Sequence, residues 1–379
     1  MKTKQIQFFL VFMYFAFSAS FPIPLLAKES KFYINAGAGL ISVYFPERES
    51  FPFYEHDGFG IADGRVQSPM RFELQDTTSK GQLIIGYQFG GADQSKNSLW
   101  SHSVGNNLRI EFSTNFYFPE ESQTIKPLAP ENLGSFVAGV YYDNKGMQGM
   151  ALLGRNNDLP DIRMTADFDY IDLNLGLRSD YPLGSSRFSL SPYLGIIYAN
   201  LRQKFETYAT THPTVAAILA TGSYNYNVDE NLTSDYLGGL FGLDLTAKAG
   251  DSFTFSIGGI ISPLYLHTDM DISSRGDIYV PINLKERTRT KVHVSDTDFT
   301  YRALGKIELS YDFNGFCIGL NGILDYWENV SVVKYPSYNV GEFDFGGFSG
   351  STTLPNYVPS IAESSMTNWS IMLIAGFYF

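Results

Sequence analysis

The chain has 379 residues, a net charge of −12 and a pI near 4.9, and this acidic balance argues against a nucleic-acid surface, which is basic. Charged residues make up only 17% of the chain, against about 25% in a typical soluble domain, whereas aromatic residues make up 16%. High Tyr, Phe and Gly content suits a protein of many strands and turns with aromatic girdles at membrane interfaces.

The cysteine and histidine content points away from metal sites and disulfides. Cys317 is the single cysteine, so the chain forms no intramolecular disulfide. The five histidines are scattered without zinc-ligand spacing: His56, His102, His212, His267 and His293. We therefore expect no metal and no cofactor.

The N-terminal segment predicts export. Lys2 and Lys4 precede the apolar stretch 8–17, "FFLVFMYFAF", and small residues follow. This is the pattern of a secretory signal peptide, which we place at 1–27, with Ser20 as the alternative cleavage position. No later stretch holds 18 or more apolar residues, so we expect no transmembrane helix in the mature chain, 28–379.

The mature chain reads as a series of segments in which apolar and polar residues alternate, which is a strand signal. Ten such segments follow one another: 31–42, 81–89, 107–118, 167–179, 187–202, 234–249, 252–268, 296–313, 315–330 and 368–379. We predict a closed antiparallel transmembrane β-barrel of about ten strands.

The connections favour a barrel over a sandwich. "YPLGSS" at 181–186, "GD" at 250–251 and "NG" at 314–315 are short, whereas the connections near 43–80, 119–166, 203–233, 269–295 and 331–367 are long. Short periplasmic turns and long extracellular loops are typical of outer-membrane barrels. Within the long connections, 134–142 reads as an extra strand that would favour twelve, and 213–222 as a short helix toward the lumen.

One face of nearly every strand is apolar, and the other is mixed and charged. Charges belong in a polar lumen because they are costly on the lipid face. The predicted lumen-lining residues are Arg109, Glu111, Asp172, Arg178, Asp244, Lys248, Arg302, Lys306, Glu308 and Asp325. Acidic and basic members are equal in number, so they invite cross-lumen ion pairs that narrow or plug the barrel.

Three stretches, 168–204, 234–265 and 301–327, resemble the Legionella-type major outer membrane protein family. In the first, "IDLNLG" at 171–176 and "GIIYANL" at 195–201 are similar to a strand pair of that family. The segments 234–265 and 301–327 are similar to later hairpins of the family. The resemblance covers roughly 165–330 and the last strand. It implies a pore-forming outer-membrane barrel and supplies no catalytic residue.

We therefore predict an integral outer-membrane protein of a Gram-negative bacterium that acts as a passive pore for ions or small polar solutes. The alternative is a surface structural or adhesive barrel with a closed lumen. An enzyme is the least favoured hypothesis; it would need His267, Asp269 and Asp271 to converge with Asp296 and Asp298.

The final strand carries a further prediction. Phe377 and Phe379 end an alternating aromatic strand, which resembles the signal that barrel-assembly machinery reads. The expected partners are this machinery, outer-membrane lipid and lipopolysaccharide, with no nucleic acid; the sequence leaves the oligomeric state open.

Overall fold

A computed structural model describes most of the region predicted to form the barrel. The described residues are 31–45, 53–56, 75–89, 108–125, 136–155, 161–183, 185–210, 223–250, 252–279, 285–313, 315–336 and 358–379. The proposed signal peptide and the segment 213–222 lie outside them. Among the described residues, no helix is long and apolar enough to cross a membrane.

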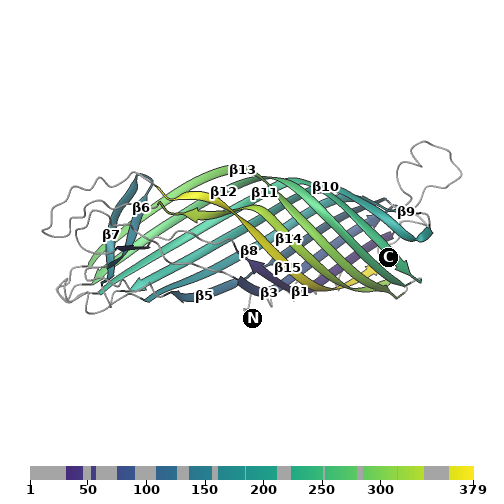
Figure 1. The fold of residues 1–379 in the computed structure, drawn as a ribbon, viewed down its shortest axis with the longest axis horizontal. Coiled ribbons are helices and arrows are strands. Elements are labelled where there is room, and N and C mark those ends of the chain that lie inside the picture. The colour runs from purple at the N-terminus through teal and green to yellow at the C-terminus, as the bar shows by residue number, and fades with distance from the viewer. Residues whose placement is uncertain are drawn as a thin grey trace.

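Ten antiparallel strands form a closed ring (Figure 1). In ring order they are β1 (Lys31–Tyr44), β3 (Gln75–Gln88), β4 (Leu108–Tyr117), β8 (Asp161–Ser179), β10 (Ser185–Thr210), β11 (Ser223–Ala249), β12 (Phe253–Tyr279), β13 (Lys285–Asp312), β14 (Phe316–Lys334) and β15 (Ser360–Tyr378). The ring closes where β1 pairs with β15, from Tyr33–Tyr378 to Tyr44–Thr367. The predicted closed barrel of ten strands is confirmed.

The remaining strands lie outside this ring. β5 (Glu120–Ile125) continues the pairing of β4 along β8, and β9 (Tyr181–Leu183) pairs with the start of β10. β2 (Phe53–His56), β6 (Phe136–Asp143) and β7 (Gly146–Arg155) form a separate three-stranded sheet. The segment 134–142 therefore does contain a strand, but it does not raise the ring to twelve.

Two of the predicted tight turns are shaped by glycine. Gly250 and Gly315 have φ angles of 68° and 100°, a region that favours glycine because it has no Cβ. These turns gather at one end of the barrel, here called the short-turn end, where Phe379 also lies (Figure 1). The opposite end is the long-strand end.

Outward-facing side chains form an apolar band between two aromatic girdles, as expected for lipid contact. Tyr301 and Tyr311 on β13 stand ten residues apart, close to the length that crosses a hydrocarbon core. One girdle lies at the short-turn end, with Phe89, Phe188, Phe253, Tyr311, Phe313, Phe377 and Phe379. The other contains Tyr44, Tyr198, Tyr265, Phe299, Tyr301 and Trp369.

Four strands run far past the second girdle. β10 to β13 have 26 to 28 residues each, more than twice the roughly 9–11 that a membrane strand needs. Beyond the girdle their amphipathicity reverses. The neighbouring strand β8 shows the same reversal: exposed Leu173 and buried Asp172 give way to exposed Asp169 and buried Phe168. The predicted loops 203–233 and 269–295 are therefore mostly strand, because water replaces lipid outside and apolar side chains turn inward.

Ring closure places glycines against backbone on the inner face of β1. A Cβ on Gly39 would lie 2.0 Å from the carbonyl oxygen of Ile371 across the β1–β15 seam, whereas a Cβ on Gly37 would meet its nearest atom at 3.4 Å. We predict that Gly39→Ala lowers the folded, heat-modifiable fraction of the refolded protein on a gel. Gly37→Ala is the matched control and should fold like the wild type; equal yields for both variants would contradict this account of the seam.

Candidate functional site

The interior of the barrel at the short-turn end is a polar chamber. The Arg109 guanidinium lies 2.5 Å from Asp180, and Tyr33 Oη donates a 2.6 Å hydrogen bond to Glu111. Asp244 lies 2.5 Å from Arg178 and 2.8 Å from Lys306. Tyr33 and Asp244 are buried, whereas Arg109, Asp180, Arg178 and Lys306 keep partial exposure, so water reaches this part of the lumen.

A buried ionic layer crosses the lumen next to this chamber. Arg302 donates two 2.7 Å hydrogen bonds to the two carboxylate oxygens of Asp325 and a 3.1 Å bond to Asp172. Its guanidinium carbon lies 4.7 Å from the ring centroid of Trp327. Arg302, Asp172 and Asp325 are at most 5% exposed. We call Arg302, Asp172, Asp325 and Trp327, with Lys80, the Arg302 layer.

The charges in this layer are satisfied. Asp172 also accepts hydrogen bonds from Asn115, Tyr170 and Asn174, at 2.9 to 3.1 Å. Lys80 is 5% exposed and donates a 3.2 Å hydrogen bond to Ser370. Two cations, Arg302 and Lys80, thus balance two carboxylates, which matters because a buried charge without a counterion costs several kcal/mol.

Aromatic rings fill the space beside the Arg302 layer. Tyr117 stacks on Tyr170 with ring centroids 4.5 Å apart, and Tyr236 packs edge-on against Trp327 at 4.8 Å. All four rings are at most 2% exposed. A water molecule therefore has almost no contact with them, and the lumen is closed at this level.

The end of the β14–β15 hairpin, 330–336 with 358–364, closes the lumen a second time. Ser331 bonds to Thr268 on β12 at 2.7 Å through its hydroxyl, and its carbonyl accepts from Gln203 on β10 at 2.7 Å. Tyr335 donates a 2.7 Å hydrogen bond to Glu230 on β11. We call this segment the plug. Val333 and Tyr335 join a buried cluster that also contains Ile162, Met164, Phe168, Phe205, Tyr226, Val228, Leu232, Met270, Ile272 and Val292.

The plug turns inward because the pairing of β13 with β14 stops early. The ladder runs from Asp312–Cys317 to Arg302–Trp327, while β14 has a bulge between Trp327 and Val330. Beyond it, β13 and β14 follow separate paths through the described residues. The space between 285–301 and 328–334 is here called the β13–β14 gap.

Aspartates protect the strand edge along this gap. The Thr297 N–H donates to the Asp296 carboxylate at 2.8 Å, and the Phe299 N–H donates to Asp298. Asn329 bridges the gap with a 3.0 Å bond to Thr300 and a 3.3 Å bond to Asp298. Charged side chains on an unpaired edge prevent pairing with other strands, which explains why Asp296 and Asp298 occur together.

A second carboxyl group reaches Asp298 from β15. Glu363 hydrogen-bonds to Asp298, and this bond raises the pKa of Glu363 to about 7 while it lowers the pKa of Asp298. Partial burial and the nearby Asp296 charge add to the rise. While Glu363 is protonated, it donates this bond to the Asp298 carboxylate and so joins the plug hairpin to β13.

The acidic groups of the enzyme hypothesis do not form one site. Asp269 lies 3.5 Å from His267 and Asp271 lies 3.0 Å from His293, all exposed on the outer wall. Asp296 and Asp298 pair with buried Thr268 and Leu266 and lie toward the inner side. Within the described residues, no group of three or more His, Cys, Asp or Glu side chains is placed to hold a metal ion.

The predicted lumen residues lie on the inner face, but their roles differ. Arg302, Asp172 and Asp325 close the lumen, whereas Arg109, Glu111, Arg178, Asp244 and Lys306 line the chamber. Glu308 is half-buried and Lys248 is exposed near the short-turn end. The alternation of single strands does not single out Lys80, Tyr117, Tyr170 and Trp327, which also lie inside the barrel. The available signal was bulky aromatic residues at inward positions of β4, β8 and β14.

Solved structures of outer-membrane proteins are similar to this chain at low sequence identity. No family model matches the chain, and no curated protein matches it. Similar solved structures include the Escherichia coli outer membrane protease OmpT, at 10% identity and a TM-score of 0.38 over 94% of this chain and 99% of that one. A Pseudomonas aeruginosa FadL homologue matches at 8% identity and TM-score 0.23, covering 92% and 90% of the two chains. The outer membrane channel DcaP of Acinetobacter baumannii matches at 10% identity and TM-score 0.15, covering 94% and 99%. The barrel assignment itself rests on the strand pairing above.

The Arg302 layer gives a prediction for stability. Arg302→Ala leaves Asp172 and Asp325 buried without their main counterion, so we expect a loss of about 3–5 kcal/mol in the free energy of unfolding. Urea titration of the barrel folded in lipid vesicles measures it. Arg202→Ala, on the exposed face of β10, is the control and should change stability by about 0.5 kcal/mol or less. Similar losses for both variants would refute a special role for Arg302.

The Glu363–Asp298 contact gives a prediction for pH. Because the pKa of Glu363 is raised, its contribution to the contact is complete at low pH and is lost as the pH rises through about 7. Hydrogen exchange of 296–301, corrected for intrinsic rates, should show falling protection between about pH 5 and pH 8. Glu363→Gln keeps a donor to Asp298 at every pH and should remove this dependence. An unchanged pH profile in that variant would rule out the proton on Glu363 as its cause.

Proposed function

We propose that this protein is a channel for ions or small polar solutes in the outer membrane of a Gram-negative bacterium, and that its resting state is closed. The observation that supports this most is the arrangement of the lumen. A hydrated, charged chamber occupies the short-turn end, and the buried Arg302 layer separates it from the long-strand end.

The orientation and assembly belong to the same proposal. The short-turn end faces the periplasm and the long-strand end faces outward, as in other outer-membrane barrels. Phe377 and Phe379 act as the signal for the barrel-assembly machinery, and lipid and lipopolysaccharide surround the apolar band. Membership of the Legionella-type major outer membrane protein family stays a prediction from the sequence, and the proposal includes no catalytic step.

Opening requires movement of the plug and of the Arg302 layer. Trp327 of the layer and Val330 of the plug are separated only by the bulge in β14, so the two closures lie on one strand. The plug is held by the Ser331 and Tyr335 hydrogen bonds and by the Glu363–Asp298 contact. Since β13 and β14 are unpaired beside it, withdrawal of the plug breaks no β13–β14 ladder bonds.

A structural barrel with a permanently closed lumen is the second candidate. It is favoured by the balanced charges and close packing of the Arg302 layer, which resemble a protein core more than a conduit. The two candidates differ in what happens when the plug is destabilised.

Planar-bilayer recording of the refolded protein distinguishes them. Wild-type protein should show few or no conductance steps. Val333→Asp places a carboxylate in the buried cluster around the plug, so we expect expulsion of the plug and a clear increase in openings. Val332→Asp, at the neighbouring half-exposed position, is the control and should behave like the wild type. A folded Val333→Asp barrel that never conducts would reject the channel and favour the structural barrel.

A further inference from the structure

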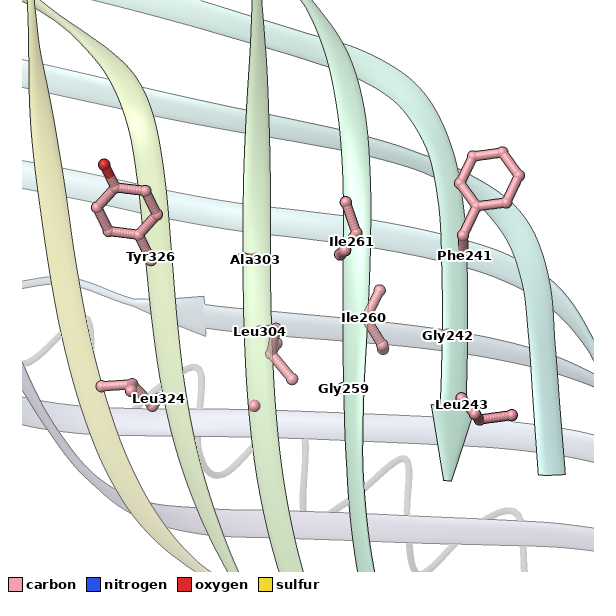
Figure 2. A pocket seen from close by; sticks show the side chains of 11 residues that line it. Phe241, Gly242, Leu243, Gly259, Ile260, Ile261, Ala303, Leu304, Leu324 and Tyr326 are labelled. Atoms are coloured by element: carbon pink, nitrogen blue, oxygen red, sulfur yellow. The ribbon is translucent and has the colours of Figure 1, made fainter. Parts of the chain in front are cut away.

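Apolar side chains gather in two places, one on the outer wall and one inside the long-strand end. On the outer wall, a groove of about 640 Å³ crosses β11 to β14, with Phe241 and Leu243 on one side and Leu324 and Tyr326 on the other (Figure 2). This groove lies in the lipid-facing band, where acyl chains of any kind cover it, so it selects no particular ligand. The inner place is different, because a side chain of the plug occupies it and shows which chemistry it accepts.

Tyr335 is the side chain that occupies the inner place. It is 2% exposed, and its hydroxyl donates a 2.7 Å hydrogen bond to a carboxyl oxygen of Glu230 on β11, which is itself fully buried. The centroid of its ring lies 5.6 Å from that of Tyr142 on β6. One directed hydrogen bond and contacts with aromatic and apolar side chains thus hold a phenol group. We call the space that this group fills, with Glu230 at its end, the Tyr335 site.

The wall of the Tyr335 site does not depend on the plug. Glu230 lies within continuous ladders, since β11 pairs with β10 as far as Thr210–Asn225 and with β12 as far as Ser223–Tyr279. In the buried cluster around the plug, Val333 and Tyr335 come from the plug, and the other members lie on ring strands or on β6. The wall is therefore in place whether or not the plug occupies the site.

The contacts of the plug with this wall are ones that a free molecule can compete for. The ladder of the plug joins it to 360–364, which is the other arm of the same hairpin. Across the lumen, Ser331 bonds to β12 and β10, and Tyr335 bonds to β11. One net hydrogen bond is worth about tenfold in an equilibrium constant. A ligand that makes the same contacts as Tyr335 therefore competes with it for the site.

Glu230 makes the site selective. A polar group buried among apolar side chains needs a hydrogen-bond partner. When Tyr335 leaves, Glu230 loses the donor that Tyr335 supplied, so a ligand that replaces the ring must also bring a donor. Sites that hydrogen-bond a hydroxyl reject analogues without it more strongly than apolar pockets reject a difference in size. A phenol supplies both the ring and the donor, whereas a hydrocarbon or an aryl ether supplies only the ring.

We propose that the Tyr335 site binds a small phenol, a single aromatic ring with a free hydroxyl, and that this ligand displaces the plug. The ligand hydroxyl donates to Glu230, and the ring lies beside Tyr142 in the cluster that Tyr335 occupies in the closed state. The inference rests on the movable plug of the proposed function and names a class of solute for it. Binding itself needs no conduction.

Calorimetric titration of the refolded barrel in detergent tests the site. The probes are p-cresol, which is the tyrosine side chain as a free molecule, and its methyl ether 4-methylanisole, with titration into empty micelles as the baseline. Wild type should bind p-cresol about tenfold more tightly than the ether, because only p-cresol donates to Glu230. Glu230→Leu should bind both probes equally. Tyr335→Phe removes the bond between the plug and Glu230, so the plug competes less well and the affinity for p-cresol should rise about tenfold.

Tyr208→Phe, which removes an exposed tyrosine hydroxyl from the outer face of β10, is the matched control and should bind like the wild type. Absence of p-cresol binding to wild type, equal affinity for the two probes, or an unchanged p-cresol affinity in Tyr335→Phe would overturn the proposal. The comparison of the two probes needs only wild-type protein, so it decides the matter even where a variant fails to fold.

Conduction is a separate result. Openings in Val333→Asp without p-cresol binding to wild type would reject the Tyr335 site and keep the channel. Binding of p-cresol that competes with Tyr335 but never gives current would keep the site and reject the channel.

Discussion

The structure depends on a change of solvent along single strands. A strand that leaves the hydrocarbon region for water must exchange its apolar and polar faces, because charged side chains are costly toward lipid and apolar ones are costly toward water. β8 shows the exchange between Asp169 and Asp172. The membrane part is therefore polar inside, whereas the part beyond the second girdle has an apolar core like a soluble protein.

The Arg302 layer lies where these two interiors meet. Its charged side chains are buried, so they are stable as ions only while they contact one another. Trp327 packs on Arg302 and on Tyr236, and these two rings lie between the charges and the apolar interior. The plug extends that apolar side inward from β14. The same bulge that frees the plug leaves an edge on β13, and Asp296 and Asp298 cap its N–H groups. The closed lumen, the gap and the acidic pair are thus consequences of one interrupted ladder.

Much of this architecture follows from the sequence. Period-two alternation predicts the membrane strands and their lipid faces, and "GD" and "NG" predict two of the turns. The strand extensions were missed because polar outward residues such as Asp269 and Asp271 look like loop composition when water replaces lipid outside. The sequence predicts Arg302, Asp172 and Asp325 only as inward-facing charges. The alternation along one strand shows which way a side chain faces, but it does not show which side chains from different strands meet across the lumen. The bulge at 328–329 has no turn residue that marks it, apart from Asn329.

Glycine has opposite roles on the inner and outer faces of the barrel wall. Inside, small residues such as Gly86 make room for aromatic rings of the protein itself, whereas outside, Gly305 leaves room that the protein does not fill. This contrast fits a barrel with a closed interior whose exposed surfaces meet the membrane.

Quenching of Trp327 fluorescence tests the closed lumen most directly. The chain has three tryptophans, so Trp100→Phe with Trp369→Phe leaves Trp327 as the only reporter. In vesicles with iodide on both sides, the account predicts that Trp327 is almost fully shielded, since it is 1% exposed at the level that closes the lumen. Quenching as strong as that of a free indole in water would show that solvent passes through the Arg302 layer and would contradict the account.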